Sequence, residues 1–472
     1  MNTGITEFLQ SHAEENPVWF HMPGHKGEQI FEENGYGEFI HHIINGDITE
    51  IEGADNLFQT EGIILNTMER YKAIYKVRKS FLLINGSSAG LIAAIMTSVE
   101  RGHKLIMARN CHKSVFNGLK LAGAEPVYLY PEEIEDFGIS GEIRVEEVKR
   151  ALEEHPDSDA VIITSPNYYG ICSDIRAICE EVHKAGKILI VDQAHGAHLP
   201  LFETYADQKT LSAESQGADI VINSTHKTLA SFTQTAIANL CTDRVDPVFF
   251  EDRLQMIEST SPSYLLMASL DMNAAILEKN GEKLIHQWKE NLEYFYKEAK
   301  KIRGLKLLEH PALDHTKLNL DMSLAGIDGL KLEELLIKKG IYVELVTGNI
   351  LMCMSGIGNR RCDYERLLEA LKEISEEHPL IKEKNEKGDQ ALAMKKWKQR
   401  PVPHYVEKVP VDQAGGRVCG ASIIPYPPGI PIICPGEVME DEVLQYVKEL
   451  RAKGEKVMGI DQDGNVFAGK EE

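Results

Sequence analysis

Short apolar runs alternate with stretches of helical periodicity between Ser80 and Leu240. The runs are rich in Val, Ile and Leu, which is typical of strands buried on both faces of a largely parallel sheet built from βαβ units. The predicted strands are 80–84, 104–108, 126–130, 160–164, 188–192, 219–224 and 236–240. The pattern therefore predicts the α/β class, with polar residues gathered where the strands end.

The pattern becomes helical beyond Pro262 and then mixed, and a chain of 472 residues exceeds what one hydrophobic core usually organises. A charged stretch that ends in prolines has the composition of a linker or exposed helix. The predicted division is an N-terminal segment (1–40), a large domain (41–265), a small α+β domain (266–376), a linker (377–404) and a C-terminal domain (405–472).

The formal net charge of −22 disfavours a nucleic-acid partner, because phosphates would be repelled. No apolar run is long enough for a membrane span, and the first residues lack a secretory signal, so we expect no membrane partner and a cytoplasmic location. The eight cysteines include no CxxC pair, which argues against a disulfide framework and against a structural zinc site. We expect no bound metal.

Two residues at predicted strand ends have complementary chemistry. Lys227 follows the strand 219–224, and a desolvated lysine amine can form a Schiff base with an aldehyde. Asp192 ends the strand 188–192, and one βαβ crossover would bring it to the same crevice, where a carboxylate can pair with a pyridine nitrogen. Taken singly, Lys227 could be a solvated loop lysine and Asp192 a helix N-cap. His195 could be a ligand or a packing residue.

The segment 85–90 (NGSSAG) lies between a predicted strand and a predicted helix, so its amides and hydroxyls form a helix N-terminus suited to a phosphate. It lacks the patterns of a nucleotide P-loop and of a dinucleotide-binding loop. After the next strand, His112 in the segment 111–114 (CHKS) could stack on a flat cofactor.

These segments together resemble the bacterial ornithine/lysine/arginine decarboxylase family of fold-type-I pyridoxal-phosphate (PLP) enzymes, in the shorter branch without the N-terminal wing domain. The similar segments run in order from Phe20 to Glu437. They are HMPGHKG (21–27), NGSSAG (85–90), RNCHKSVFNGLKLAGAEPVYL (109–129), DQAHGAH (192–198), STHK (224–227), TSPSY (260–264) and PYPPGIPIICPGE (425–437).

The resemblance implies a catalytic group and a set of cofactor contacts within the large domain. Lys227 matches the Schiff-base lysine, Asp192 the partner of the pyridine nitrogen and His112 the imidazole on the ring. The expected cofactor contacts are Ser87, Ser88, Ala89, His112, Asp192, His195, Ser224, His226, Lys227 and Thr260. Thr260 is expected to reach the partner subunit's phosphate, and His21, His25 and Glu437 are expected at the substrate or the subunit interface. The segment 1–40 would contribute to the interface of a homodimer or larger homo-oligomer.

The implied reaction is decarboxylation of a small cationic amino acid, with arginine preferred (to agmatine) over lysine (to cadaverine) and ornithine (to putrescine). These amines are products of polyamine biosynthesis. A PLP-dependent aminotransferase or aldolase of the same fold is the main alternative. The others are a non-catalytic PLP-binding protein and a metal-dependent protein built on His21, His25, Cys111 and His112.

Overall fold

The computed structural model describes residues 4–381, 395–426, 431–452 and 456–470. Part of the predicted linker and residues 427–430 of the PYPPGIPIICPGE segment lie outside the described residues. In the part of the chain that is described, no helix is both long and apolar enough to cross a membrane.

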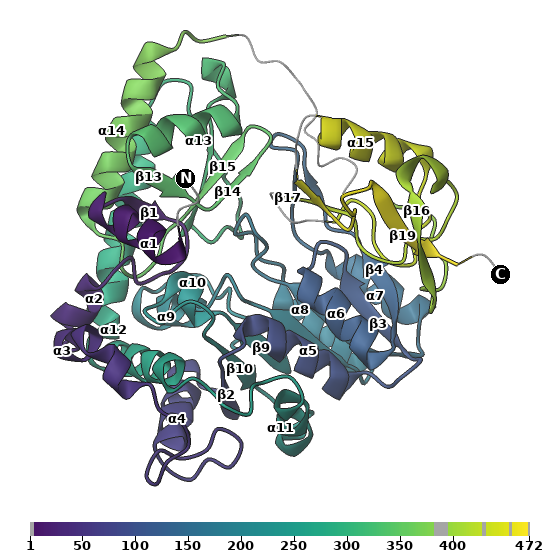
Figure 1. Cartoon of the computed structure of the whole chain (residues 1–472), viewed down its shortest axis with the longest axis horizontal. Helices are drawn as coiled ribbons and strands as arrows, with labels where there is room; N and C mark the ends of the chain where they lie inside the picture. Colours follow the sequence, from purple (N-terminus) through teal and green to yellow (C-terminus); the bar gives the residue numbers. More distant parts are fainter. Residues whose placement is uncertain (1–3, 382–394, 427–430, 453–455, 471–472) are drawn as a thin grey trace.

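A seven-stranded sheet forms the centre of the large domain (Figure 1). Its order is β2-β10-β9-β8-β7-β3-β4, and neighbouring strands are parallel except around β10, which is antiparallel to both neighbours. The strands are β2 (Lys79–Leu83), β3 (Lys104–Ala108), β4 (Glu125–Leu129), β7 (Ser158–Thr164), β8 (Ile188–Asp192), β9 (Ile220–Asn223) and β10 (Ala236–Leu240). Every predicted strand is present, and the predicted α/β class is confirmed.

Helices cover both faces of this sheet. Ile162 and Ile190 pack on one face, whereas the residues that follow them, Ile163 and Val191, pack on the other. The first face carries α5 (Gly86–Ser98), α6 (Lys113–Ala122) and α11 (Pro247–Gln255), and the second carries α7 (Val145–Glu154) and α8 (Ile175–Lys184). Because neither face meets water, polar side chains of the strands reach a site mainly at the strand ends.

The small domain is built on the antiparallel sheet β11-β12-β15-β14. Its strands are β11 (Lys306–Leu307), β12 (Lys317–Asp321), β14 (Leu345–Thr347) and β15 (Ile350–Met354), and its helices are α12 (Tyr264–Ala299), α13 (Gly329–Lys338) and α14 (Arg361–Glu377). The N-terminal region contains α1 (Ile5–Glu14), β1 (Val18–Phe20), α2 (Gln29–Glu33), α3 (Gly37–His41) and α4 (Ile63–Tyr75). Strand β1 pairs in parallel with β13 (Ile341–Val343), so part of the predicted N-terminal segment belongs to the small domain.

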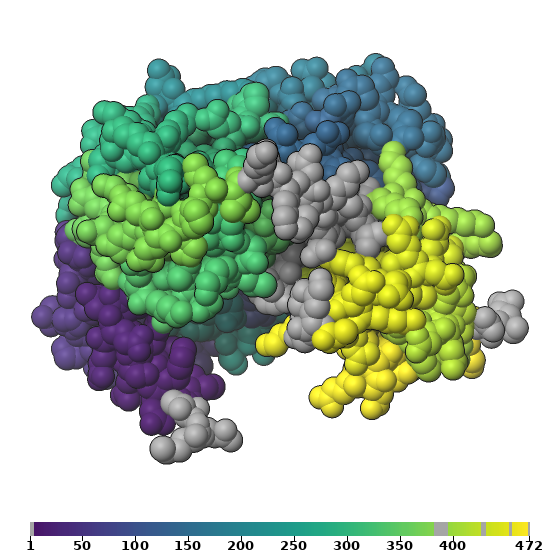
Figure 2. All heavy atoms as spheres, turned by 90° about the horizontal axis from the view of Figure 1, so that it is seen from above, coloured from purple at the N-terminus to yellow at the C-terminus, as the bar shows by residue number. Residues whose placement is uncertain are grey.

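The C-terminal unit lies beside the small domain (Figures 1 and 2). It contains the pairs β16 (Val406–Pro410) with β19 (Asn465–Gly469) and β17 (Ile424–Tyr426) with β18 (Lys456–Met458), together with α15 (Asp441–Ala452). Met352 and Met354 of the small domain share one hydrophobic cluster with Ile433 and Val443 of this unit. The shared core joins the two parts of the chain.

Candidate active site

The parallel neighbours β8 and β9 bring Asp192 and Lys227 to one edge of the large sheet. Asp192 is the last residue of β8, and Lys227 lies in the short helix α10 (Thr225–Thr228) that follows β9. The Asp192 side chain is buried, with Oδ1 accepting a hydrogen bond from Ala194 N at 3.1 Å. Burial raises the pKa of Asp192, and the nearby Lys227 opposes this shift. Asp192 is not a helix N-cap, because the next helix, α9 (Leu199–Tyr205), begins after His198.

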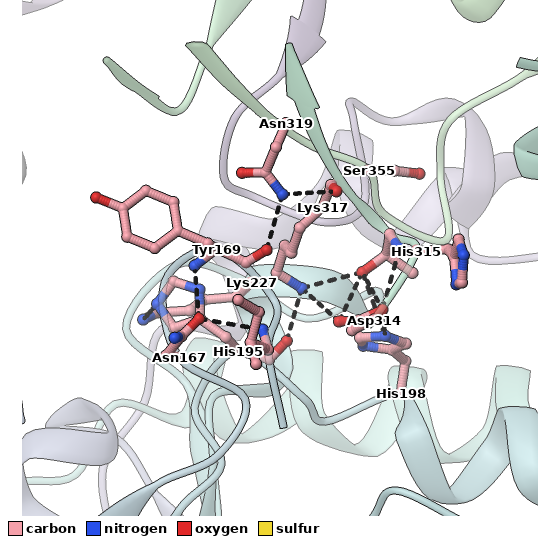
Figure 3. A network of polar contacts seen from close by, with 12 residues as sticks. Asn167, Tyr169, His195, His198, Lys227, Asp314, His315, Lys317, Asn319 and Ser355 are labelled. Carbon is pink, nitrogen blue, oxygen red and sulfur yellow. Dashed lines mark hydrogen bonds and ion pairs between the residues drawn. The ribbon is translucent and has the colours of Figure 1, made fainter. Parts of the chain in front are cut away.

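The amine of Lys227 faces His195. The distance from Lys227 Nζ to His195 Nε2 is 2.9 Å (Figure 3). Burial lowers the pKa of Lys227, and Asp192 opposes this. Burial and the charge of Lys227 hold the pKa of His195 well below its usual value, so the ring stays neutral. A desolvated lysine of lowered pKa is a stronger nucleophile than a solvated one.

His112 begins helix α6 and lines the same cavity. Its Nδ1 accepts hydrogen bonds from Ser114 N at 3.3 Å and from Ser114 Oγ at 2.8 Å. Burial, followed by the charge of Lys227, lowers the pKa of His112 to about 4. The ring is therefore neutral and held in orientation, as a stacking group requires.

The NGSSAG segment forms the N-terminus of α5, as predicted for residues 85–90. Asn85 is the N-cap, but its side chain does not cap the helix and instead donates to Ile257 O at 3.0 Å. The first-turn amides of Ser87, Ser88 and Ala89 are thus left to bind an anion.

Two polar residues beside Lys227 were also predicted to contact a phosphate. Ser224 Oγ is buried and has no hydrogen-bond partner within the described chain. The ring of His226 bonds through Nδ1 to Thr235 O at 2.7 Å, and burial lowers its pKa to about 4. Since the carbonyl accepts from Nδ1, the neutral ring carries its proton there, and His226 needs a second proton to donate through Nε2.

A cavity of about 580 Å³ opens around Lys227. Its lining comes from the large domain, from the small domain with the N-terminal segment, and from the C-terminal unit. The lining residues are Met22, His112, Lys113, Tyr168, His195, Lys227, Glu333, Glu344, Leu345, Val346, Ile424, Lys456 and Met458. The ring of Tyr168 packs edge-on against His195, with centroids 5.0 Å apart. The sequence did not predict Tyr168, Glu333 or Glu344 in the cavity, because no local motif marks residues that only tertiary folding brings there.

The HMPGHKG segment packs against the loop of its own chain that carries Lys227. Gly24 N donates to His226 O at 2.7 Å, and a Cβ atom at Gly24 would lie 2.5 Å from the backbone carbon of Thr228. Only glycine permits this contact between two backbones. His25 packs beside the same loop, against aromatic rings. Contact of this segment with a second chain stays a prediction.

Of the predicted cofactor contacts, His112, His195 and Lys227 line the cavity of the described chain. The others do not, namely Ser87, Ser88, Ala89, Asp192, Ser224, His226 and Thr260, and neither do His21, His25 and Glu437. Thr260 is exposed, and His21 lies among aromatic rings near β1 and β13. Glu437 is fully buried, and its two carboxylate oxygens accept from Arg109 Nε and Nη2, each at 2.8 Å. Cys434 N donates to the same carboxylate at 2.8 Å. In this chain Glu437 therefore anchors the C-terminal unit to the large domain instead of contacting the cavity.

A buried polar network lies behind His195 and joins the large and small domains (Figure 3). Lys317 Nζ forms an ion pair with Asp314 Oδ2 at 2.8 Å, and Asp314 Oδ1 lies 3.1 Å from His198 Nε2. Burial lowers the pKa of His198, and Asp314 opposes this shift. His198 also contacts the ring of Trp288. Within the described chain, the four residues considered as metal ligands do not form a cluster.

Comparisons with known proteins give one consistent result. A sequence model of the Orn/Lys/Arg decarboxylase major domain matches residues 3–319, and one of the C-terminal domain of the same family matches residues 380–467. The arginine decarboxylase of Bacillus subtilis (strain 168) is 32% identical over 96% of this chain and 94% of its own length.

Two solved structures have the same fold. The constitutive lysine decarboxylase of Escherichia coli superposes with a TM-score of 0.75 at 21% identity, over 98% of this chain and 81% of that one. The serine palmitoyltransferase of Sphingomonas wittichii superposes with a TM-score of 0.57 at 16% identity, over 77% of this chain and 88% of that one. The fold is therefore that of the fold-type-I PLP enzymes, as the sequence predicts.

Proposed function

Because this chain belongs to the Orn/Lys/Arg decarboxylase family and is a basic amino-acid decarboxylase, we propose that it converts L-arginine to agmatine with PLP bound at Lys227. The observation that carries the proposal is the juxtaposition of Lys227, which lines the cavity, and the buried Asp192 carboxylate at adjacent strand ends. A nucleophile for an aldehyde thus lies close to an acceptor for a protonated ring nitrogen.

The unpaired polar groups of the site fit this cofactor. Ser224 Oγ lacks a partner within the described chain, and the first turn of α5 has no side-chain cap, so both suit a phosphate group. Asp192 suits the ring nitrogen, and the neutral ring of His112 suits the face of the pyridine. These residues, together with Ser87, Ser88, Ala89, His195 and His226, would hold the cofactor.

When bound, PLP supplies a protonated pyridine ring that takes up the electron pair left on Cα as carbon dioxide departs. Asp192 would keep the ring nitrogen protonated, because a nearby carboxylate favours the cationic form. Lys227 would release the cofactor to the incoming amino group and afterwards hold the proton that returns to Cα. Its lowered pKa suits both roles, because the amine gives up its proton more readily than that of a solvated lysine. His195 Nε2, 2.9 Å away, would orient the amine.

Arginine is proposed as the substrate because the Bacillus subtilis relative with that activity is similar over nearly the whole chain. The test is an amine-product assay in which purified, PLP-loaded protein receives arginine, lysine or ornithine. The expected result is agmatine from arginine at the highest kcat/KM. Cadaverine or putrescine as the main product would replace arginine in the proposal, and keto-acid formation without carbon dioxide would contradict decarboxylation.

We also propose that the protein is a homodimer or a larger homo-oligomer. Helix α1 exposes the apolar side chains of Ile5, Phe8 and Leu9, and Ile44 and Ile51 are exposed further along the N-terminal region. Exposed apolar side chains at the helical spacing of Ile5, Phe8 and Leu9 are typical of an interface. Light scattering on a sizing column should give at least twice the chain mass of 52.9 kDa. A monomeric mass at micromolar concentration would contradict this proposal.

A further inference from the structure

Glu344 presents a fixed carboxylate to the cavity that contains Lys227. It lies between β13 and β14 and lines this cavity from the small-domain side. Its Oε2 accepts a hydrogen bond from Met22 N at 2.9 Å, and its own backbone N donates to Met352 O at 3.1 Å. The position of the carboxylate is therefore set by two other segments of the chain.

No cationic side chain of the described chain forms an ion pair with Glu344. The nearby Lys26 uses its ammonium group on the backbone oxygens of His21 and Met354, the second at 3.2 Å. Burial raises the pKa of Glu344, and Lys227 and Lys26 oppose the shift only through space. A partly desolvated carboxylate without a cationic partner is unfavourable, so a ligand that brings a cation would offset the cost.

The other charged groups of the cavity favour one orientation of an amino-acid substrate over the reverse one. Lys113 and Lys456 are cations, which attract a carboxylate and repel a cationic side chain. Glu333 and Glu344 are the carboxylates in the lining. Both are half-buried, but Glu344 is held by a backbone amide, whereas Glu333 lies on α13 and its carboxylate forms no hydrogen bond within the described chain. A preorganised acceptor discriminates more strongly than a mobile one.

We propose that Glu344 accepts the positively charged end of the substrate side chain and thereby selects basic amino acids. The inference rests on the proposed function and specifies a residue for it. Arginine, lysine and ornithine all carry a cation at this end. A neutral analogue of the same length would leave the carboxylate without a cationic partner.

The test compares a cation with its neutral isostere in the PLP-loaded enzyme. Glu344→Gln removes the charge but keeps an oxygen that can accept from Met22 N. Calorimetry would measure binding of agmatine and of N-carbamoylputrescine, whose urea group is neutral. The expected result is a loss of agmatine affinity of about 10- to 100-fold in Glu344→Gln, with little change for N-carbamoylputrescine. The value of kcat/KM for arginine should fall by a similar factor.

The controls separate this inference from the choice of arginine. Glu334→Gln removes an exposed carboxylate of α13 and should leave both affinities unchanged. If the wild-type enzyme binds cadaverine but not agmatine, the arginine assignment fails, and the comparison of cadaverine with pentylamine tests Glu344. Equal losses for cation and neutral analogue, no loss, or a larger loss in Glu333→Gln would overturn the inference. A wild-type enzyme that binds neither agmatine nor cadaverine would also overturn the inference.

Discussion

The ammonium group of Lys317 donates a hydrogen bond of 2.8 Å to the backbone oxygen of His195. Both residues are buried, and the ring of the same histidine lies 2.9 Å from Lys227 Nζ (Figure 3). Asp314 holds Lys317 at 2.8 Å. The small domain thus fixes the backbone at His195, and the ring of His195 contacts the proposed catalytic Lys227.

Replacing Lys317 by Met should have two measurable effects. It leaves Asp314 buried without its ammonium partner, so the free energy of unfolding should fall by about 3–5 kcal/mol. The charge of Lys317 also lowers the pKa of Lys227, so its loss should move the pH midpoint of the bound cofactor's visible absorbance upward. Urea unfolding and a spectrophotometric pH titration measure the two effects, with the exposed Lys331→Met as the control. A lower stability without a shifted midpoint would limit Lys317 to a structural role.

Borohydride reduction of the PLP-loaded protein should attach the cofactor to Lys227. Lys227→Ala should lose the visible absorbance of the lysine-bound cofactor, and kcat should fall by at least about 10³-fold, because both the attachment point and the proton carrier are removed. Peptide mass spectrometry identifies the labelled residue. A label on Lys113 or Lys456, the other lysines that line the cavity, would contradict the assignment.

Asp192→Asn should retain PLP but decarboxylate slowly. The amide keeps the shape of the side chain but does not hold a proton on the ring nitrogen, so kcat should fall by about 10²- to 10⁴-fold. Single-turnover kinetics and cofactor titration separate chemistry from binding. Turnover within a few-fold of wild type would remove Asp192 from the mechanism.

Glu258 should make stability dependent on pH. It accepts a hydrogen bond from Asn85 N at 3.1 Å, and burial raises its pKa from 4.5 to about 7. A raised carboxyl pKa means that the folded chain binds the proton more tightly than the unfolded chain. Ionisation of Glu258 therefore lowers the free energy of unfolding. This loss is absent below about pH 4.5 and reaches its full size above about pH 7.

Glu258→Gln removes this titration and keeps an acceptor for Asn85 N. At pH 8 the variant should be more stable than wild type by on the order of 2–3 kcal/mol, and the difference should vanish near pH 4.5. Thermal unfolding across this pH range measures the difference. A stability gain that is the same at every pH would show that Glu258 does not titrate in this way.

The central sheet could be predicted because its signal is local. The run 188–192 is apolar at every position before Asp192, and it forms β8 with that aspartate at the strand end. Because adjacent parallel strands end at one edge, the approach of Asp192 to Lys227 also followed from the order of the strands. The helical pattern predicted beyond Pro262 likewise corresponds to α12, which begins at Tyr264.

The rest of the site could not be predicted in this way. Lys317 is a charged residue at the start of a small-domain strand, and nothing in its neighbours marks it as a partner of His195. Glu344 directly follows β13, which pairs with β1 from the other end of the chain, and its carboxylate is held by Met22 N. Glu437 belongs to a motif that resembles a family segment, yet Arg109 takes up its carboxylate. Such placements depend on contacts between distant segments, which periodicity does not encode.

The close contact between Gly24 and the backbone beside Lys227 has a consequence for biosynthesis. The segment 18–27 is among the first to leave the ribosome, but its partners in the small domain are among the later ones, with Met22 and Glu344 separated by 322 positions. Until those partners emerge, the segment cannot take up its folded position. A growing or truncated chain that lacks β13 therefore lacks the small-domain lining of the cavity around Lys227, so that cofactor capture should wait until this part of the chain has been made.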